Sequence, residues 1–273
     1  MDRLKGAGST FDAPLFQKQF LAYQKVPCGL TVDYYAAGSG AGASQLLNQL
    51  VDFGATDAPL TDQQLASSPK GTILHIPVTL GAVAIAYHLS TVPSSLHLSG
   101  DLLANIYLGT VTYWDDPTIK RLNTGTNLPH GAIKDLDRSD KSGTTAIFTH
   151  YLASISPRWK AAVGASTQVS WPIGQEAQGN FGVADAIGQT EGAIGYVEQS
   201  YVEAGRHLSV ASIENQAGTY VSPSIAEIQA AAASLQTIPA DLRFYAVNAP
   251  GANAYPIVGY SWVIAYPTGN APR

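Results

Sequence analysis

The sequence predicts an α/β protein that is folded as two lobes. Short apolar stretches with strand character alternate with amphipathic stretches, an order that is typical of α/β architecture. Two apolar stretches, residues 73–88 and 258–266, have the same nearly continuous β character although they lie far apart in the chain. If both enter one sheet, the end of the chain returns to the first lobe and its middle forms an inserted second lobe.

The predicted elements are justified by their apolar positions, taken in chain order. A helix near Pro14 carries Phe16, Phe20 and Tyr23 on one side, and a helix near Ala43 carries Leu46, Leu47 and Leu50. The helix near Thr144 is the clearest, because its apolar residues recur at helical spacing; they are Ile147, Phe148, Tyr151, Leu152 and Ile155. Further helices are predicted near Gly100, Val183 and Ser224. The predicted strands are residues 31–36, 73–78, 82–88, 169–172, 193–197 and 258–266.

We place the two crossings between lobes near His88 and Ser212. Residues 1–88 then form the first part of lobe 1, residues 89–212 form lobe 2, and residues 213–273 return to lobe 1. The sequence has no internal repeat at the period of a solenoid.

Composition excludes several classes of protein. The chain has 273 residues, of which 45% are hydrophobic and 13% charged, so it is a folded globular chain. Its net charge is −5 and its basic residues form no run, which argues against nucleic-acid binding. An acidic protein can still bind a small buried anion, because local dipoles hold it.

Other common signals are absent from the sequence. Cys28 is the only cysteine, so no disulfide forms within the chain, and the six histidines lack metal-ligand spacing. Asp115 and Asp116 precede Pro117 and indicate a turn or helix cap. No apolar run reaches 18 residues, and residues 1–5 are too short and polar for a signal peptide. These residues leave two alternatives open: a cytoplasmic protein, or an exported one whose leader is not in this sequence.

Three stretches place small or hydroxyl-bearing residues before a predicted helix: residues 6–11, 38–42 and 142–145. Helix N-termini carry unpaired N–H groups and about +0.5 of an elementary charge. Glycine lets backbone approach a ligand, and Ser or Thr adds a hydroxyl donor. Three such ends that converge would enclose an anion.

For any single stretch, an ordinary helix cap is the simpler interpretation. Residues 38–42 are not a P-loop, because no Gly-Lys-Ser/Thr follows. The segment 138–144 favours anion binding more strongly, since Arg138 lies just before a hydroxyl-lined helix start and has forked donors that suit two anionic oxygens. Asp140, two residues later, can hold the Arg138 guanidinium in place.

On these motifs the chain resembles the phosphate-binding proteins that deliver phosphate to ATP-driven bacterial importers. The matching segments occur in the family's order and cover most of the chain: residues 6–14 (GAGSTFDAP), 38–42 (GSGAG), 51–60 (VDFGATDAPL), 106–116 (IYLGTVTYWDD), 138–144 (RSDKSGT), 171–174 (WPIG) and 192–198 (GAIGYVE). The resemblance implies a two-lobe, type II periplasmic-binding-protein-like fold that closes about a hinge.

The resemblance also implies roles for individual residues. Asp57 matches the family's single acceptor, which receives the phosphate proton, and Asp140 matches the residue that steadies the arginine. Ser9 supports the same site. The positions that match phosphate donors are Thr10, Phe11, Ser39, Arg138, Ser142, Gly143 and Thr144. The chain departs from the family where Gly40 replaces a second serine and where the C-terminal third is shorter.

The expected function is therefore high-affinity binding of inorganic phosphate for a membrane permease, by a monomer without catalysis, metal or cofactor. The expected location is periplasmic or extracellular, with an export leader or membrane anchor that this sequence does not include. Three alternatives stay open. They are a phosphatase, for which we find no nucleophile with a base and no metal pair, a binding protein for sulfate, arsenate or molybdate, and a phosphate sensor without a transporter.

Overall fold

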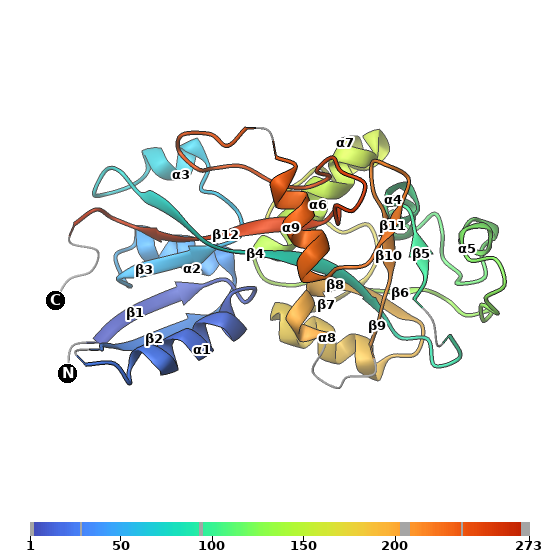
Figure 1. The fold of residues 1–273 in the computed structure, drawn as a ribbon, viewed down its shortest axis with the longest axis horizontal. Helices are drawn as coiled ribbons and strands as arrows, with labels where there is room; N and C mark the ends of the chain where they lie inside the picture. The colour runs from blue at the N-terminus through green and yellow to red at the C-terminus, as the bar shows by residue number, and fades with distance from the viewer. Residues whose placement is uncertain (1–2, 28, 93–94, 203–207, 236, 269–273) are drawn as a thin grey trace.

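The protein is described here by a computed structural model that covers residues 3–27, 29–92, 95–202, 208–235 and 237–268. Cys28 and His207 lie outside these residues. Within them, nine strands form one mixed sheet that runs through both halves of the molecule (Figure 1). The strand order is β2-β1-β3-β12-β4-β8-β6-β7, and β9 pairs with β4. The alternation of strands and helices confirms the predicted α/β class.

The first half is built on parallel strands: β1 (Arg3–Gly8), β2 (Thr31–Ala36) and β3 (Phe53–Thr56). Their register pairs Gly8 with Ala36 on one side and with Ala55 on the other. The carboxyl ends of the three strands therefore meet at one edge, where α/β sheets commonly bind ligands.

Two long strands connect the halves. In β4 (Leu74–Tyr87), the predicted stretches 73–78 and 82–88 merge into one strand. It pairs antiparallel with β12 (Val258–Ala265) over residues 74–82, and β12 also pairs with β3. The prediction that these two strands enter one sheet and bring the chain back to the first half is confirmed.

The second half continues the sheet with β8 (Ala193–Glu198), β6 (Lys134–Arg138) and β7 (Gln175–Ala177), and β9 (Ser209–Val210) pairs with β4. A separate small sheet contains β5 (His97–Leu98), β10 (Ser212–Glu214) and β11 (Tyr220–Val221). Figure 1 shows this half to the right of β1, β2 and β3.

Helices cover the sheet in both halves. The first half contains α1 (Ala13–Tyr23), α2 (Ser39–Leu47) and α3 (Asp62–Ala66). The second contains α4 (Gly100–Tyr107), α5 (Pro117–Leu122), α6 (Gly143–Ile155), α7 (Pro157–Ala162), α8 (Gly179–Gln189) and the 3-10 turn η1 (Gln199–Tyr201). Helix α9 (Ile225–Ala233) lies beside β4 and β12 (Figure 1). No described helix has the length and apolar character that crossing a bilayer requires.

Each half has its own core. In the first, Ala7, Leu46 and Trp262 belong to one buried cluster. In the second, the Tyr151 side chain of α6 packs in a larger cluster that also contains Ile228 and Tyr255. Residues from the C-terminal part of the chain therefore contribute to both cores, and the lobe boundaries near His88 and Ser212 stay predictions.

The strand predicted at residues 169–172 is wrong. That segment has no strand structure, and β7 begins only at Gln175. Its apolar character serves packing instead of strand formation. The centroid of the Trp171 ring lies 5.8 Å from the ring centroids of Tyr107 and Trp159. Pro172 lacks the N–H that a sheet ladder needs.

The predicted starts of two helices are also wrong: α2 begins at Ser39 rather than near Ala43, and α8 begins at Gly179 rather than near Val183. In α2, glycine is required for close packing rather than for a loop. A side chain at Gly42 would lie 2.6 Å from the Ala7 carbonyl oxygen and 2.7 Å from that of Ala55. Helix α2 thus packs directly on the sheet backbone.

Candidate anion-binding site

The site lies where strands from both halves end. Ser9 and Thr10 follow β1, and Asp57 follows β3; from the other half, Arg138 is the last residue of β6. Helices α2, α6 and α8 begin near this place, because they follow β2, β6 and β7, which are neighbours of one another or of the named strands in the same sheet. The fold therefore brings together residues that the sequence separates by more than a hundred positions.

Asp57 is the central acceptor. Its side chain is buried at 2% exposure and faces three serine hydroxyls. Ser9 Oγ lies 2.7 Å from both carboxylate oxygens, Ser39 Oγ lies 3.2 Å from Oδ2, and Ser261 Oγ lies 2.7 Å from Oδ1. Burial raises the pKa of Asp57, although the hydrogen bonds from the three serines and the charge of Arg138 lower it.

Arg138 is the central cation and is 3% exposed. Asp140 holds it by two hydrogen bonds, from Nε to Oδ1 at 2.8 Å and from Nη2 to Oδ2 at 2.6 Å. The other face of the guanidinium donates to the Thr144 hydroxyl at 3.3 Å and to the Thr10 hydroxyl at 3.2 Å. Burial raises the pKa of Asp140, but Arg138 and the hydrogen bond from the Gly179 amide outweigh burial and hold this pKa below its ordinary value. Arg138 thus spans the two halves.

Asn180 belongs to this network and was not predicted. It is fully buried at the first turn of α8. Its Nδ2 donates to the hydroxyls of Thr10 at 2.9 Å and Thr144 at 3.2 Å, and its backbone N–H donates to Thr10 at 3.3 Å. Its Oδ1 accepts from the Glu198 amide at 3.0 Å. The pair Gly179–Asn180 at a helix start is the only sequence signal that could have pointed to it, and it is a weak one.

The N-terminus of α6 faces the first half directly. A side chain at Gly143 would lie 2.3 Å from Ser39 Oγ and 2.4 Å from Asp57 Oδ2. Ser142 caps the helix, since its Oγ accepts from the Thr145 N–H at 3.1 Å. A hydroxyl that accepts one hydrogen bond still has its own proton to donate. The cap interpretation and the ligand interpretation are therefore compatible at Ser142.

Phe11 is the predicted site residue that contributes least through its side chain. The ring is buried in the core of the second half and packs against Gly81. Its backbone N–H donates to Ser9 Oγ at 2.9 Å. The predicted residues that the structure joins by direct contacts are Ser9, Thr10, Phe11, Ser39, Asp57, Arg138, Asp140, Gly143 and Thr144. In the described part of the chain, the Ser142 side chain is bonded only within its own helix start.

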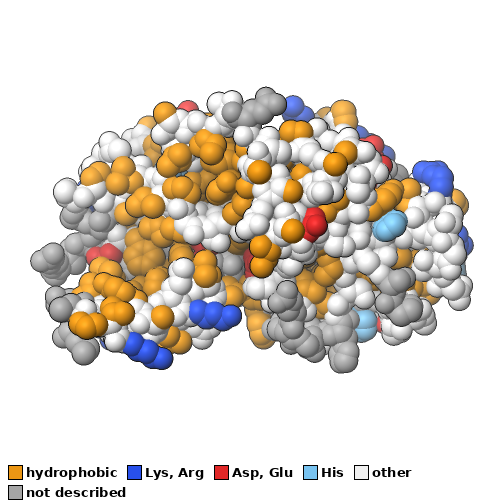
Figure 2. Space-filling view, viewed as in Figure 1, with side chains coloured by type: hydrophobic (Ala, Val, Ile, Leu, Met, Phe, Trp, Pro, Cys, Tyr) orange, Lys and Arg blue, Asp and Glu red, His pale blue; other side chains and the backbone are white. Residues whose placement is uncertain are grey.

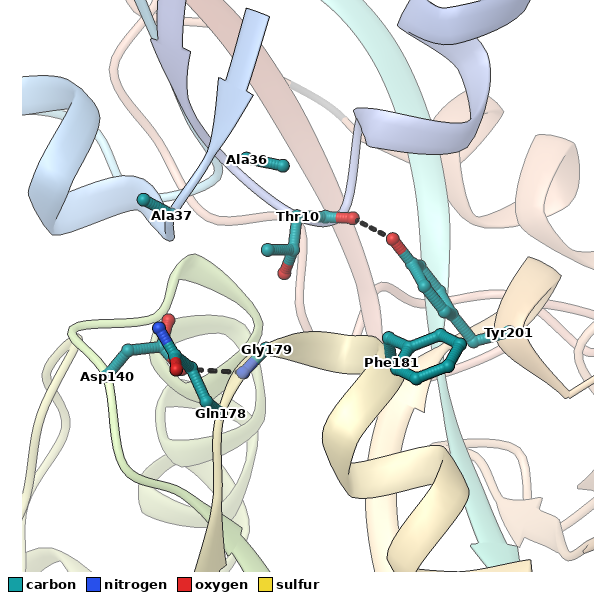
Figure 3. A pocket seen from close by; sticks show the side chains of 8 residues that line it. All are labelled: Thr10, Ala36, Ala37, Asp140, Gln178, Gly179, Phe181 and Tyr201. Carbon is teal, nitrogen blue, oxygen red and sulfur yellow. Dashed lines mark hydrogen bonds between the residues drawn. The ribbon is translucent and has the colours of Figure 1, made fainter.

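A cavity of about 250 Å³ opens beside Thr10, where the two halves meet. Figure 3 shows Asp140 and Gly179 on one side of it and Tyr201 on the other. The Tyr201 hydroxyl donates to the Thr10 carbonyl at 2.6 Å, and Gly179 N–H donates to Asp140 at 3.0 Å. Of the eight predicted ligands, only Thr10 lines this cavity, so it lies beside the buried network rather than at its centre.

The described residues contain no group of three or more His, Cys, Asp or Glu side chains that is arranged to hold a metal ion. The prediction of a cap before Pro117 is confirmed, because Asp116 accepts from the Thr118 N–H at 2.7 Å. On the face drawn in Figure 2, Lys and Arg side chains lie at separate points rather than in one patch.

Comparison with known proteins gives consistent results. A family model described as "PBP superfamily domain" matches residues 1–272. The phosphate-binding protein PstS of Pasteurella multocida is 37% identical over 272 residues, which cover 99% of this chain and 78% of the relative. The PstS of Xylella fastidiosa is 36% identical over 264 residues, covering 96% and 71%.

The fold also matches solved structures. One is a protein from Clostridium perfringens, assigned as a phosphate ABC transporter substrate-binding protein and solved with bound phosphate. It superposes with a TM-score of 0.71 at 16% identity and covers 100% of this chain and 89% of its own. At this identity the likeness concerns the fold alone.

Proposed function

Because this chain belongs to the PBP superfamily, and within it to the family of PstS phosphate-binding proteins, we propose that it binds inorganic phosphate between its two lobes and delivers it to an ATP-driven membrane importer. Its fold is the two-lobe, type II periplasmic-binding-protein fold that the sequence predicts. The observation that carries the proposal is a buried acceptor, Asp57, that accepts from serine hydroxyls of the first lobe and faces the start of α6 in the second lobe.

The proposed ligands are the eight residues derived from the sequence. Thr10, Phe11 and Ser39 belong to the first lobe, together with the acceptor Asp57. The second lobe supplies Arg138, Ser142, Gly143 and Thr144. Ser9 and Asp140 support this set, and the contacts of Asn180 add it as a third supporting residue.

The charge of phosphate is balanced by one guanidinium and by helix N-termini. Arg138 is the only cation in this network of described contacts. The first turns of α2, α6 and α8 lie beside this network, and each helix N-terminus carries a partial positive charge. A site of this kind needs no basic surface, which fits a protein with a net charge of −5.

Asp57 sets the choice of anion. An ionised carboxylate only accepts hydrogen bonds, so the ligand must supply a proton. Phosphate near neutral pH keeps at least one proton, whereas sulfate has none. With sulfate, two acceptors would face each other in a dry site. Arsenate is protonated like phosphate and is the expected competitor.

Closure about the hinge completes the site and presents one face to the permease. We keep the predicted boundaries, with residues 89–212 as the inserted lobe between residues 1–88 and 213–273. The protein acts as a monomer outside the cytoplasmic membrane, in the periplasm or extracellularly, with a leader or membrane anchor as the means of retention. No nucleic acid is a partner.

The protein performs no chemistry on the anion. Ser9, Ser39 and Ser261 all face one carboxylate, and Asp57 directs their hydroxyl protons toward itself. These serines are therefore held as hydrogen-bond donors, Ser9 and Ser261 to Asp57 and Ser39 also to the anion, rather than as nucleophiles directed at a phosphorus atom.

The direct test is isothermal titration of phosphate-stripped protein. We expect one phosphate per chain with a dissociation constant near or below 1 μM, about −8 kcal/mol or stronger. The same preparation, with or without divalent metal, should release no phosphate from phosphomonoesters. A flat titration of folded protein contradicts the binding proposal, and turnover that disappears on Asp57→Ala contradicts the absence of catalysis.

A further inference from the structure

Asp12 is a second buried carboxyl group beside Asp57, and the proposed function assigns it no role. It occupies the N-cap position of α1, where an aspartate normally accepts from first-turn amides. Here its side chain makes no such bond and is fully buried. Its Oδ1 has no hydrogen-bond partner among the described residues. The side chain is turned away from its own helix and toward the phosphate site.

Ser261 links the two carboxyl groups. Its Oγ lies 2.5 Å from Asp12 Oδ2, 2.7 Å from Asp57 Oδ1 and 3.2 Å from the Thr56 carbonyl oxygen. A serine hydroxyl has one proton and can donate one strong hydrogen bond. If both carboxylates were ionised, at least one of the two short contacts would join acceptor to acceptor. One carboxyl group therefore holds a proton.

The surroundings of Asp12 and Asp57 indicate which of the two carboxyl groups holds the proton. Burial raises the pKa of Asp57, but the hydroxyls of Ser9 and Ser39 and the charge of Arg138 stabilise its ionised form. Among the described residues, the Asp12 carboxyl group has a hydrogen bond only to Ser261.

The charged and titratable groups around Asp12 also favour its protonated form. Burial and the charge of Asp57 raise the pKa of Asp12 well above its ordinary value, and Glu198 from β8 adds to the effect. Tyr34, on β2, lies near both aspartates. Burial raises the pKa of Tyr34, and the charges of Asp12 and Asp57 raise it further. None of these neighbours is a cation that would stabilise an ionised Asp12.

We propose that Asp12 is a positioning residue that carries the proton of this pair and donates it to Ser261, so that Ser261 donates to Asp57 and keeps Asp57 an ionised acceptor. The arrangement is Asp12 Oδ2–H to Ser261 Oγ, then Ser261 Oγ–H to Asp57 Oδ1. It rests on the proposed function of the site. If the proton were on Asp57 instead, that carboxyl would donate to a ligand oxygen, and sulfate would fit as well as phosphate.

The first experiment locates the proton by infrared spectroscopy of wild type and Asp12→Asn at neutral pH. Asp135 and Asp137 contribute equally to both proteins, so the difference spectrum isolates Asp12. We expect the variant to lose the carbonyl band of a protonated carboxyl group, while Asp57→Asn retains that band. Loss of a carboxylate band in Asp12→Asn overturns the proposal. This readout does not depend on phosphate binding and so stands apart from the proposed function.

The second experiment measures phosphate affinity by titration. Asparagine also donates toward Ser261, so Asp12→Asn should bind within about threefold of wild type. Asp12→Leu leaves the Ser261 proton free to turn to Thr56 and should bind at least about fivefold more weakly, the size of one hydrogen bond. Asp135→Asn, a buried carboxyl in the other lobe, is the matched control and should match wild type.

A purely structural role for Asp12 would lower the melting temperature of both variants without separating their affinities. Equal affinity of the two folded variants therefore overturns the positioning role. If Asp12→Asn does not fold, the infrared comparison of wild type with Asp12→Leu and Asp57→Asn answers the same question. Absence of phosphate binding by wild type contradicts the proposed function and leaves the infrared result to decide on Asp12.

Discussion

At the scale of single residues, the Thr10 hydroxyl shows how the site is prepared for an anion. It accepts from the Arg138 guanidinium, from Asn180 Nδ2 and from the Asn180 amide. With its lone pairs occupied, its own proton is free to point toward a ligand oxygen. Hydroxyls fixed in this way lose little entropy when the ligand binds.

Arg138→Ala tests the largest single contribution to binding. The variant removes the charge partner of the anion, and truncating one side of a buried charged pair costs about 2–5 kcal/mol. Titration should show affinity lower by at least about 30-fold. Arg243→Ala is the matched control, because Arg243 is likewise held by carboxylates, those of Asp62 and Asp241, but has no described hydrogen bond or ion pair to a proposed ligand. Unchanged affinity in folded Arg138→Ala contradicts its role as a ligand.

Most site residues could be predicted because they lie in short local motifs, but Asn180 could not. Its role depends on contacts to Thr10, 170 positions earlier in the chain, and to Thr144. Asp12 was missed for a similar reason, since its partner Ser261 lies 249 positions away. Motifs identify donors at helix starts, whereas a contact between distant strands is set by the fold.

At the scale of elements, the long strands β4 and β12 could be predicted because their sequences are nearly continuous in apolar residues. The missed strands β1, β3 and β6 contain glycine or charged residues; β6 reads KDLDR. Each of these strands is stabilised by neighbouring strands on both sides in the sheet. This stabilisation is a tertiary effect, so the local strand propensity of the sequence does not predict it. These three strands are also the ones that end at the site.

Strand β6 contains an unusual buried acid pair. Asp135 and Asp137 lie two residues apart, so their side chains point to the same face of the sheet. Both are buried, and none of their carboxylate oxygens has a hydrogen-bond partner in the described part of the chain. Burial raises the pKa of Asp135 to about 7. Burial and the charges of Asp135 and Glu176 raise the pKa of Asp137 to about 8.

This pair predicts a loss of stability as pH rises. The folded protein binds these protons more tightly than the unfolded chain, whose aspartates titrate near 3.8. The contribution of the two protonated carboxyl groups to the free energy of unfolding is complete below pH 4 and is lost as pH rises through 7 and 8. The loss is up to about 1.4 kcal/mol per pH unit for each carboxyl group. The melting temperature of wild type should fall between about pH 5 and 9, and that of Asp135→Asn/Asp137→Asn should fall less. Parallel curves for the two proteins contradict the assignment.

At the scale of the whole molecule, direct contacts hold the two lobes in a closed arrangement. The Gly40 N–H donates to the Lys141 carbonyl at 2.9 Å, and Arg138 reaches Thr10 across the same boundary. The return of the C-terminal strand could be predicted from sequence, because β4 and β12 share a continuous apolar pattern. The packing of residues from α9 against the second core could not, since it depends on how the small elements between Ser212 and Val258 fold back.

Gly143→Ala tests closure. The added methyl group would meet Ser39 and Asp57 and should hold the lobes apart, although each lobe keeps its core. Overpacking of this kind costs about 1–3 kcal/mol, which corresponds to about fivefold to 150-fold weaker phosphate binding. Phosphate should reduce the radius of gyration of wild type in X-ray scattering but not that of the variant.

Gly131→Ala is the control for closure, because a side chain there meets nothing within 4 Å. It should bind phosphate and contract like wild type. Contraction and full affinity in Gly143→Ala would show that the lobes meet differently from the arrangement described here.

The central claim is that Asp57 selects phosphate by accepting a hydrogen bond from the proton that phosphate keeps. Competition between phosphate and sulfate for binding to wild type and to Asp57→Asn tests this claim most directly. A site built around one required hydrogen bond can reject a ligand that lacks it by about 10⁴-fold or more. Wild type should therefore bind phosphate and exclude sulfate. Asp57→Asn should still bind phosphate but reject sulfate less, because an amide donates as well as accepts. Equal binding of both anions by wild type, or unchanged selectivity in Asp57→Asn, contradicts the claim.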